Sequence, residues 1–200
     1  MAEFSYAVKI PKERIAVLIG TKGEVKKQIE DATSTRLNVD SKEGDISVSG
    51  GDALSMYSTR DIIKAIGRGF NPDVALYLLK PDFAFEVINL PEFEKPSQFM
   101  RIKGRIIGRS GRSRELIEEH TQTNISVYGK TVSIIGRAED ASVARKAIEM
   151  IIKGSPHANV YKWLERMRKE LTRRVYEEKF EDYVRKDNDE ESEEESEKKK

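Results

Sequence analysis

The chain has 200 residues, and its 36 Lys and Arg side chains nearly balance its 35 Asp and Glu side chains, for a formal net charge of +1. It has no cysteine, which excludes disulfide bonds, cysteine nucleophiles and thiolate metal sites. No stretch approaches about 18 consecutive apolar residues, so we expect a cytoplasmic protein without membrane contact. The last fourteen residues, 187–200, hold eight acids and three bases, which leaves residues 1–186 with a net charge of +6.

The first half of the chain alternates short apolar segments with turn residues. The expected elements are a strand over 4–10, a helix over 14–19, a helix after Gly23, strands over 36–40 and 46–49, and a helix over 52–67. The helix after Gly23 places Val25, Ile29 and Ala32 on one face. A short helix over 71–79, with Pro72 in its first turn, is expected to lead to the next unit.

The second half of the chain repeats this order of elements. The expected elements are a strand over 83–90, helices before Gly108 and after Gly111, strands over 124–128 and 132–135, and a helix over 138–153. A further helix should run from Ser155 to residue 186, with Val160, Trp163 and Leu164 on its apolar side. The segment 187–200 has no apolar side chain, so we expect it to be disordered.

An internal duplication relates the two halves, because residues 19–39 and 107–127 align without gaps at an offset of 88. Eight of the aligned positions are identical, where chance would give roughly one or two. The identical residues are Ile19, Gly20, Gly23, Ile29, Glu30, Thr33, Thr35 and Val39, which match Ile107, Gly108, Gly111, Ile117, Glu118, Thr121, Thr123 and Val127.

Each copy contains a GxxG loop between two helices, at Gly20-Thr21-Lys22-Gly23 and at Gly108-Arg109-Ser110-Gly111. Glycine lets a phosphate approach the backbone closely, and the helix that follows presents N–H groups at its positive end. One such loop is a weak signal. Two loops in the same frame, each followed by a hairpin and a helix, indicate KH domains, whose loop clamps the backbone of four nucleotides.

We therefore predict an α+β fold with two type I KH domains (β-α-α-β-β-α) in tandem. The predicted divisions are a first KH domain over 1–69, a connecting helix and linker over 70–82, a second KH domain over 83–154, an amphipathic C-terminal helix over 155–186 and a disordered acidic tail over 187–200.

The candidate RNA-binding residues surround the two loops. In the second module they are Arg105, Ile107, Gly108, Arg109, Ser110, Gly111, Arg112, Arg114 and Ile125, and in the first they are Gly20, Thr21, Lys22, Gly23 and Lys26. Ile107 and Ile125 could line a groove for bases, although their spacing fits core packing better. We expect the second module to be the main site, because Arg112 follows its loop where the first module has Glu24.

The residues around the second loop also resemble a known family. RIKGRIIGRSGRSRELIEEHTQTNISVYGKTVSIIG and KGSPHANVYKWLERMRKEL resemble the archaeal KH-repeat ribosome-assembly factor, whose relatives include the eukaryotic pre-ribosomal partner of the Nob endonuclease and the Krr processome proteins. The resemblance covers residues 4–186, and its most specific parts are ISVYGKTV (125–132) and GSPHANVY (154–161).

The resemblance implies a non-enzymatic factor that needs no cofactor and binds single-stranded RNA in the 3′ region of small-subunit ribosomal RNA. The implied protein partners are the 3′-end maturation endonuclease and the alpha subunit of initiation factor two. The eukaryotic relatives lack an intact loop in the first module. The intact loop at 20–23 therefore leaves open whether the first module binds RNA or protein.

Functions of other classes fit the sequence less well. An enzyme is disfavoured, because the loop at 20–24 does not complete a GxxxxGK[ST] phosphate-binding motif and the two histidines, His120 and His157, are isolated. A KH-type RNA regulator, an exosome-like subunit and a mainly protein-binding scaffold remain alternatives. For His157 and Trp163, structural roles are favoured over RNA contacts.

Overall fold

A computed structural model describes residues 4–41, 43–92 and 95–173 of the chain. The first module consists of β1 (Phe4–Lys9), α1 (Lys12–Ile19), the short turn η1 (Thr21–Gly23), α2 (Glu24–Thr33), β2 (Arg36–Asp40), β3 (Asp45–Gly50) and α3 (Ala53–Gly67). Its strands form an antiparallel sheet in the order β1-β3-β2. Asp52 starts α3 as its N-cap, because its carboxylate accepts a hydrogen bond from the Ser55 N–H at 2.7 Å.

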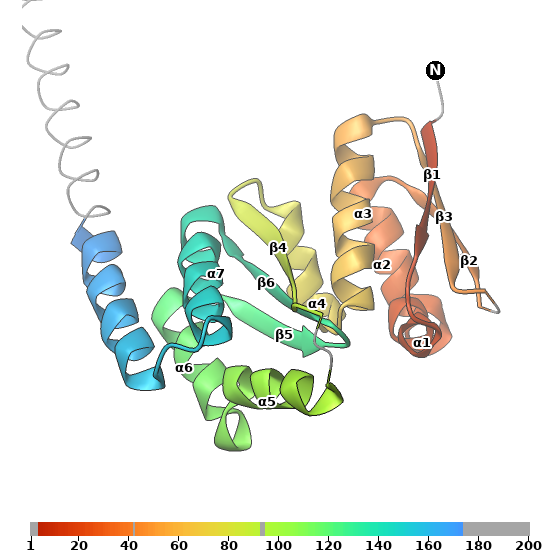
Figure 1. The fold of residues 1–200 in the computed structure, drawn as a ribbon. Helices are drawn as coiled ribbons and strands as arrows, with labels where there is room; N and C mark the ends of the chain where they lie inside the picture. The colour runs from red at the N-terminus through yellow and green to blue at the C-terminus, as the bar shows by residue number, and fades with distance from the viewer. Residues whose placement is uncertain (1–3, 42, 93–94, 174–200) are drawn as a thin grey trace, which may run out of the picture.

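The second module repeats this architecture after a short connection. It follows α4 (Pro72–Ala75) and η2 (Leu76–Leu79), and consists of β4 (Phe83–Asn89), α5 (Pro96–Ile107), η3 (Arg109–Gly111), α6 (Arg112–Thr121), β5 (Asn124–Tyr128), β6 (Thr131–Arg137) and α7 (Ala138–Ile152). The sheet order, β4-β6-β5, matches that of the first module. The expected order of elements is therefore confirmed in both halves, as Figure 1 shows.

The buried face of α2 differs from the expected one. Ala32 is exposed, and Thr33 is buried in its place together with Ile29. The hydroxyl of Thr33 donates to the Ile29 carbonyl at 2.7 Å and lies 2.8 Å from the hydroxyl of Thr35. Because the Thr33 hydroxyl has hydrogen-bond partners inside the protein, Thr33 can be buried beside Ile29, whereas the hydrophobic pattern alone assigns Ala32 to the buried face.

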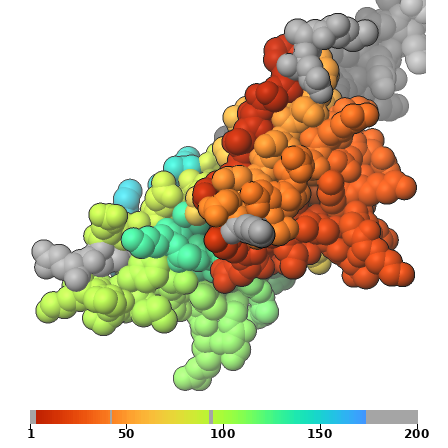
Figure 2. All heavy atoms as spheres, turned by 90° about the vertical axis from the view of Figure 1, so that its right-hand side faces the viewer, coloured from red at the N-terminus to blue at the C-terminus, as the bar shows by residue number. Residues whose placement is uncertain are grey.

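The two modules share an interface, because the central strand of the second sheet, β6, contributes side chains to both cores. Val132 and Ile134 of β6 point into the second core, whereas Ile135 belongs to the first core. Phe85 of β4 meets Phe70 edge to face, with ring centroids 6.4 Å apart. Within the connecting segment 70–82, which contains the expected short helix, Phe70, Ala75 and Leu78 are buried in the first core. In Figure 2 the first module, in red and orange, lies directly against the green and cyan second module.

Polar contacts hold the same interface. The Arg68 guanidinium donates to the Thr131 hydroxyl at 3.2 Å, and the Ser126 hydroxyl donates to the Arg68 carbonyl at 2.8 Å. The Tyr128 hydroxyl donates to the carboxylate of Glu13. These bonds join α1 and the end of α3 to the second sheet, so polar contacts add to the apolar ones between the modules.

A C-terminal helix follows the second module and packs on it. Residues 157–173 are helical. Val160 and Leu164 are buried in the second core, and Trp163 packs against that core, which confirms the expected apolar side of this helix. The expected continuation to residue 186 and the acidic tail over 187–200 lie outside the described residues.

Candidate nucleic-acid interface

The two glycine loops have the same backbone conformation. The first glycine of each loop, Gly20 or Gly108, has φ +72 or +76 with an extended ψ, a combination that residues with a side chain rarely adopt. The third loop residue, Lys22 or Ser110, is left-handed at φ 55 or 52, although it is not glycine. Such uncommon backbone conformations cluster at ligand sites, and both loops hold theirs at equivalent positions.

The glycines serve two different purposes in the second loop. A Cβ on Gly108 would lie 2.6 Å from the Ser113 Cβ and 2.7 Å from its backbone nitrogen, so close packing requires the absence of a side chain. At Gly111 the nearest atom is a carboxylate oxygen at 3.8 Å, so the space above its backbone is open. Gly111 is also the N-cap of α6 and offers no side chain to the first-turn N–H groups. The loop therefore leaves an approach for an anion at a positive helix end.

Exposed cations surround this approach in the second module. Arg109 and Arg112 are exposed, and the only ion pair of Arg112 among the described residues is with Glu115, at 3.8 Å, where both side chains are more than half exposed. An exposed pair of this kind is weak, so Arg112 can exchange Glu115 for a phosphate at little cost. In the first module Thr21 and Lys22 are exposed as well, and Glu24 occupies the first turn of α2.

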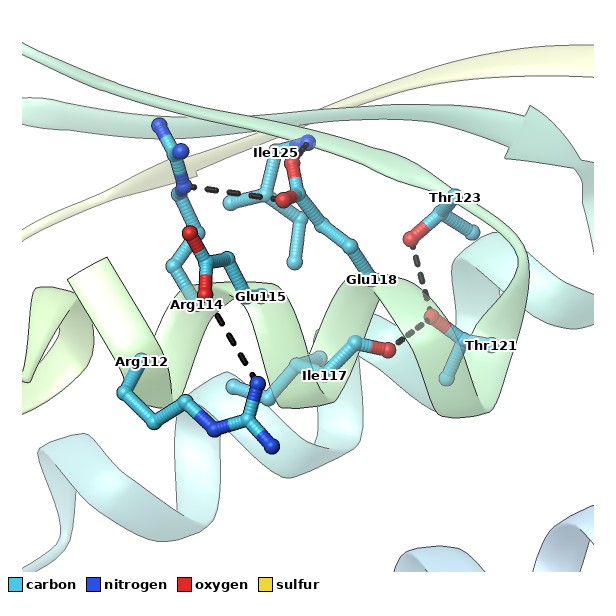
Figure 3. Close-up of polar contacts among 8 residues, drawn as sticks. All are labelled: Arg112, Arg114, Glu115, Ile117, Glu118, Thr121, Thr123 and Ile125. Atoms are coloured by element: carbon cyan, nitrogen blue, oxygen red, sulfur yellow. Dashed lines mark hydrogen bonds and ion pairs between the residues drawn. The ribbon is translucent and has the colours of Figure 1, made fainter.

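Arg114 and Lys26, expected as RNA contacts, take part in a duplicated structural network. Arg114 pairs with Glu118 at 3.5 Å, and Lys26 pairs with Glu30 at 3.9 Å. Glu118 also accepts the backbone N–H of Ile125 at 2.7 Å, as Figure 3 shows. Burial raises the pKa of Glu118, while the Ile125 N–H and Arg114 oppose that rise. The carboxylate links the helix to the neighbouring strand, and the cation beside it supports that link.

The same arrangement explains three of the eight repeat identities, namely the glutamate and the two threonines. In the first module Glu30 accepts the Leu37 N–H at 2.7 Å, which is the counterpart of the Glu118 contact. The threonine pairs are duplicated too, since the Thr121 hydroxyl donates to the Ile117 carbonyl at 2.7 Å and lies 2.9 Å from the Thr123 hydroxyl. Glutamate and threonine thus recur because they fasten the second helix of each module to the sheet.

Arg105 is directed into the protein, although it was expected to contact RNA. Its guanidinium donates to the carbonyls of Ile151 at 3.0 Å and Ser155 at 2.6 Å, at the C-terminal end of α7. The backbone carbonyl of Arg105 lies 2.8 Å from His157 Nε2. Arg105 therefore ties α5 to the end of α7 and to the turn that follows it, and His157 has the structural role expected from the sequence.

An apolar strip on α5 leads to the second loop. Met100, Gly104 and Ile107 lie on one helix face at spacings of four and three. Met100 is 65% exposed, Gly104 is exposed and Ile107 is half-buried, whereas Ile125 is only 4% exposed and belongs to the core. Ile107 is thus available at the surface. Ile125 supports the site from beneath.

Gly104 is a candidate site residue that the sequence reasoning missed. It lies inside α5, where glycine destabilises the helix by roughly 1 kcal/mol relative to alanine. A Cβ there would have no neighbour within 4 Å, so neither packing nor backbone conformation requires glycine. Its flat surface beside the loop suits the close approach of a ligand. The signal available in the sequence was a glycine within a helical segment, four residues before the loop.

The described residues offer little for other chemistry. They contain no group of three or more His, Asp or Glu side chains able to hold a metal ion. Within those residues, no helix is long and apolar enough to cross a membrane. The arrangement instead combines a flat apolar strip, an open glycine loop and exposed arginines.

These features define the class of the chain as a protein with two KH domains in tandem. The model of the KH domain family matches residues 5–68, and a model described as eukaryotic type KH-domain (KH-domain type I) matches residues 84–169. A KH domain-containing protein of Methanocaldococcus jannaschii is 43% identical over 175 residues, which cover 85% of this chain and 77% of that protein.

Two further similarities narrow the class to a family. The crystal structure of an a/eIF2alpha-aDim2p-rRNA complex from Pyrococcus horikoshii contains a similar chain, with a TM-score of 0.79, 46% identity and coverage of 84% of this chain and 96% of that one. The pre-rRNA-processing protein pno1 of Aspergillus fumigatus is 32% identical over 114 residues, 55% of this chain and 45% of that longer protein. The chain belongs to the archaeal KH-repeat family of ribosome-assembly factors, the relatives of Dim2p and pno1.

Proposed function

We propose that the protein is a non-enzymatic RNA-binding factor of small-subunit ribosome biogenesis, which acts in the cytoplasm. It holds single-stranded RNA near the 3′ end of the small-subunit ribosomal RNA, mainly through the second glycine loop. The observation that carries the proposal is the open loop at Gly108–Gly111, flanked by two exposed arginines and continuous with the strip that contains Gly104. The names of the relatives, which include a Dim2p–rRNA complex, support it.

The geometry suggests a division of labour within the site. The loop backbone and the guanidinium groups of Arg109 and Arg112 hold consecutive phosphates, which fixes the path of the RNA backbone. Bases then turn toward α5 and pack on Ile107 and on the flat surface of Gly104. Each loop also has one hydroxyl that can donate a hydrogen bond, from Thr21 at the second loop position of the first module and from Ser110 at the third loop position of the second.

A pair of matched double variants tests which loop is the main site. Arg109→Glu with Arg112→Glu and Lys22→Glu with Lys27→Glu change the charge equally, and all four residues are exposed. We expect the first pair to weaken binding of a single-stranded oligonucleotide with the ribosomal 3′-end sequence by at least tenfold more than the second, at fixed salt. Equal losses in a filter-binding titration would contradict the assignment of the second module.

The identity of the RNA needs a separate experiment. Crosslinking of the protein to RNA in cell extract, followed by sequencing of the attached fragments, should enrich the 3′ end of the small-subunit ribosomal RNA. Reads spread over messenger RNA would favour a general KH regulator instead. We further propose the 3′-end maturation endonuclease and the alpha subunit of initiation factor two as protein partners; the latter is named in the Pyrococcus horikoshii complex.

A further inference from the structure

The edge strand β1 borders a groove that the RNA site does not use. Sheet order places β1 at one edge of the first sheet, and none of the described strands pairs with its outer side. The groove lies between β1 and one face of α3, which contributes Met56, Tyr57, Arg60 and Lys64. An unpaired strand edge presents a row of N–H and C=O groups, and a further extended strand can bind to them.

Large apolar side chains are exposed at this groove. Phe4 is 49% exposed and Tyr57 is 56% exposed, so each leaves a substantial apolar surface in water. The Tyr6 hydroxyl donates to the Met56 carbonyl at 2.6 Å and fixes the strand to the helix. The groove is therefore a formed surface between two tied elements. It offers apolar contacts to the side chains of an added strand.

The second module provides an internal comparison, because an ion pair connects its edge strand to the corresponding helix. Arg145 of α7 pairs with Glu86 of the edge strand β4 and, at 3.0 Å, with Glu149 one helical turn further on. Ala141 and Ser142 of α7 occupy the positions that correspond to Met56 and Tyr57 of α3. In the second module the edge strand is thus tied to the helix by charged side chains, where the first module has exposed aromatic ones.

The first module lacks both carboxylates of that ion-pair network. Tyr6 takes the place of Glu86, since these residues face the equivalent partners Val48 and Ile134 in β3 and β6. Arg60 corresponds to Arg145, and Lys64 replaces Glu149, because α3 and α7 are both 15 residues long. The groove therefore holds cations without an acid in its lining, although Arg60 contacts Asp61 outside it at 3.1 Å.

We propose that this groove binds an extended, acidic segment of a protein partner, which adds to β1 as a fourth strand. Its backbone pairs with the free edge of β1, its apolar side chains pack on Tyr57 and Phe4, and its carboxylates meet Lys64 and Arg60. A second copy of the chain fits poorly, since the same cations would face each other across the contact. Because the site is remote from the second glycine loop, the proposal is independent of the RNA-binding function.

A designed peptide tests the proposal on the full-length protein. The probe is an end-blocked, fluorescein-labelled nonapeptide of alternating valine and glutamate, followed by fluorescence anisotropy and by amide NMR. We expect binding with amide shifts over 4–9 and 53–64. Lys64→Glu places a carboxylate where the second module has Glu149 and should weaken binding at least tenfold, with a smaller loss for Lys64→Gln. Lys162→Glu, the same charge change on the exposed side of the C-terminal helix, should leave binding unchanged.

Control probes separate the proposed partner from other ligands. A peptide with lysine in place of glutamate should not bind, and neither should one that is N-methylated at alternate residues, because it cannot pair with a strand edge. Absence of binding by the valine–glutamate peptide would overturn the proposal, as would equal weakening by Lys64→Glu and Lys162→Glu. Displacement of the peptide by an octauridylate would show that the groove binds nucleic acid, which also refutes it.

Discussion

Replacement of Gly104 by alanine should change protein stability and RNA affinity in opposite directions. Gly104 lies in the last turns of α5, its φ is not left-handed, and an added Cβ would meet no atom within 4 Å. The substitution therefore gains the helix propensity of alanine, about 0.5–1 kcal/mol, without a steric penalty. For a chain of this size, a gain of 1 kcal/mol raises the melting temperature by about 2–4 °C.

The same methyl group would stand between α5 and a base packed on it. We expect Gly104→Ala to weaken oligonucleotide binding by about threefold to tenfold, or roughly 0.7–1.4 kcal/mol. Calorimetric melting and a filter-binding titration on the same preparation measure both effects. The matched control is Ala16→Gly, the equivalent exposed position of α1, which should lower the melting temperature without a comparable change in RNA affinity. A stabilised variant with unchanged affinity would refute the assignment of this strip to the RNA site.

Four further predictions concern the structural roles found around the site and between the modules. Arg105→Ala should destabilise the protein by about 2 kcal/mol, because its contacts with two backbone carbonyls are lost. The salt dependence of RNA binding should stay unchanged. If the slope of log K against log salt concentration became smaller by about one, Arg105 would be a phosphate contact instead. Glu118→Ala should cost about 1–3 kcal/mol, because the Ile125 N–H loses its acceptor, and Glu118→Gln should cost less. Burial raises the pKa of Glu118, so the folded protein binds the carboxyl proton more tightly than the unfolded chain does. The free energy of unfolding, relative to that of Glu118→Gln, should therefore fall as pH rises above the usual pKa of 4.5. Denaturant titrations that give the same difference in unfolding free energy at every pH would contradict this. Phe85→Ala should weaken the contact with Phe70, so that the fluorescence of Trp163 and the circular dichroism no longer report one common unfolding transition.

The local sequence was sufficient to predict the element order and the loops. Hydrophobic periodicity, the turn residues and the ungapped repeat are properties of neighbouring residues, and helices, strands and glycine turns form from such short-range preferences. The position of Gly108 is an example, because its conformation and its close contact with Ser113 are both decided within six residues of chain. The same holds for Thr33 and Thr35, although only the structure revealed that they bond to each other.

Tertiary structure decided which charges remain available. Arg105, Arg109 and Arg112 look alike in the sequence, yet Arg105 binds carbonyls 46 and 50 residues away, whereas Arg109 and Arg112 stay exposed. Lys64 lines the groove beside β1, whereas Glu149, at the corresponding position of α7, pairs with Arg145. This difference is visible only once each helix has been placed beside its edge strand. The partners of a side chain depend on contacts between segments that are distant in the sequence. Local sequence patterns do not predict which of these segments come together. The sequence by itself therefore determined the two KH modules and their loops, and long-range packing determined which of their surfaces can bind a ligand.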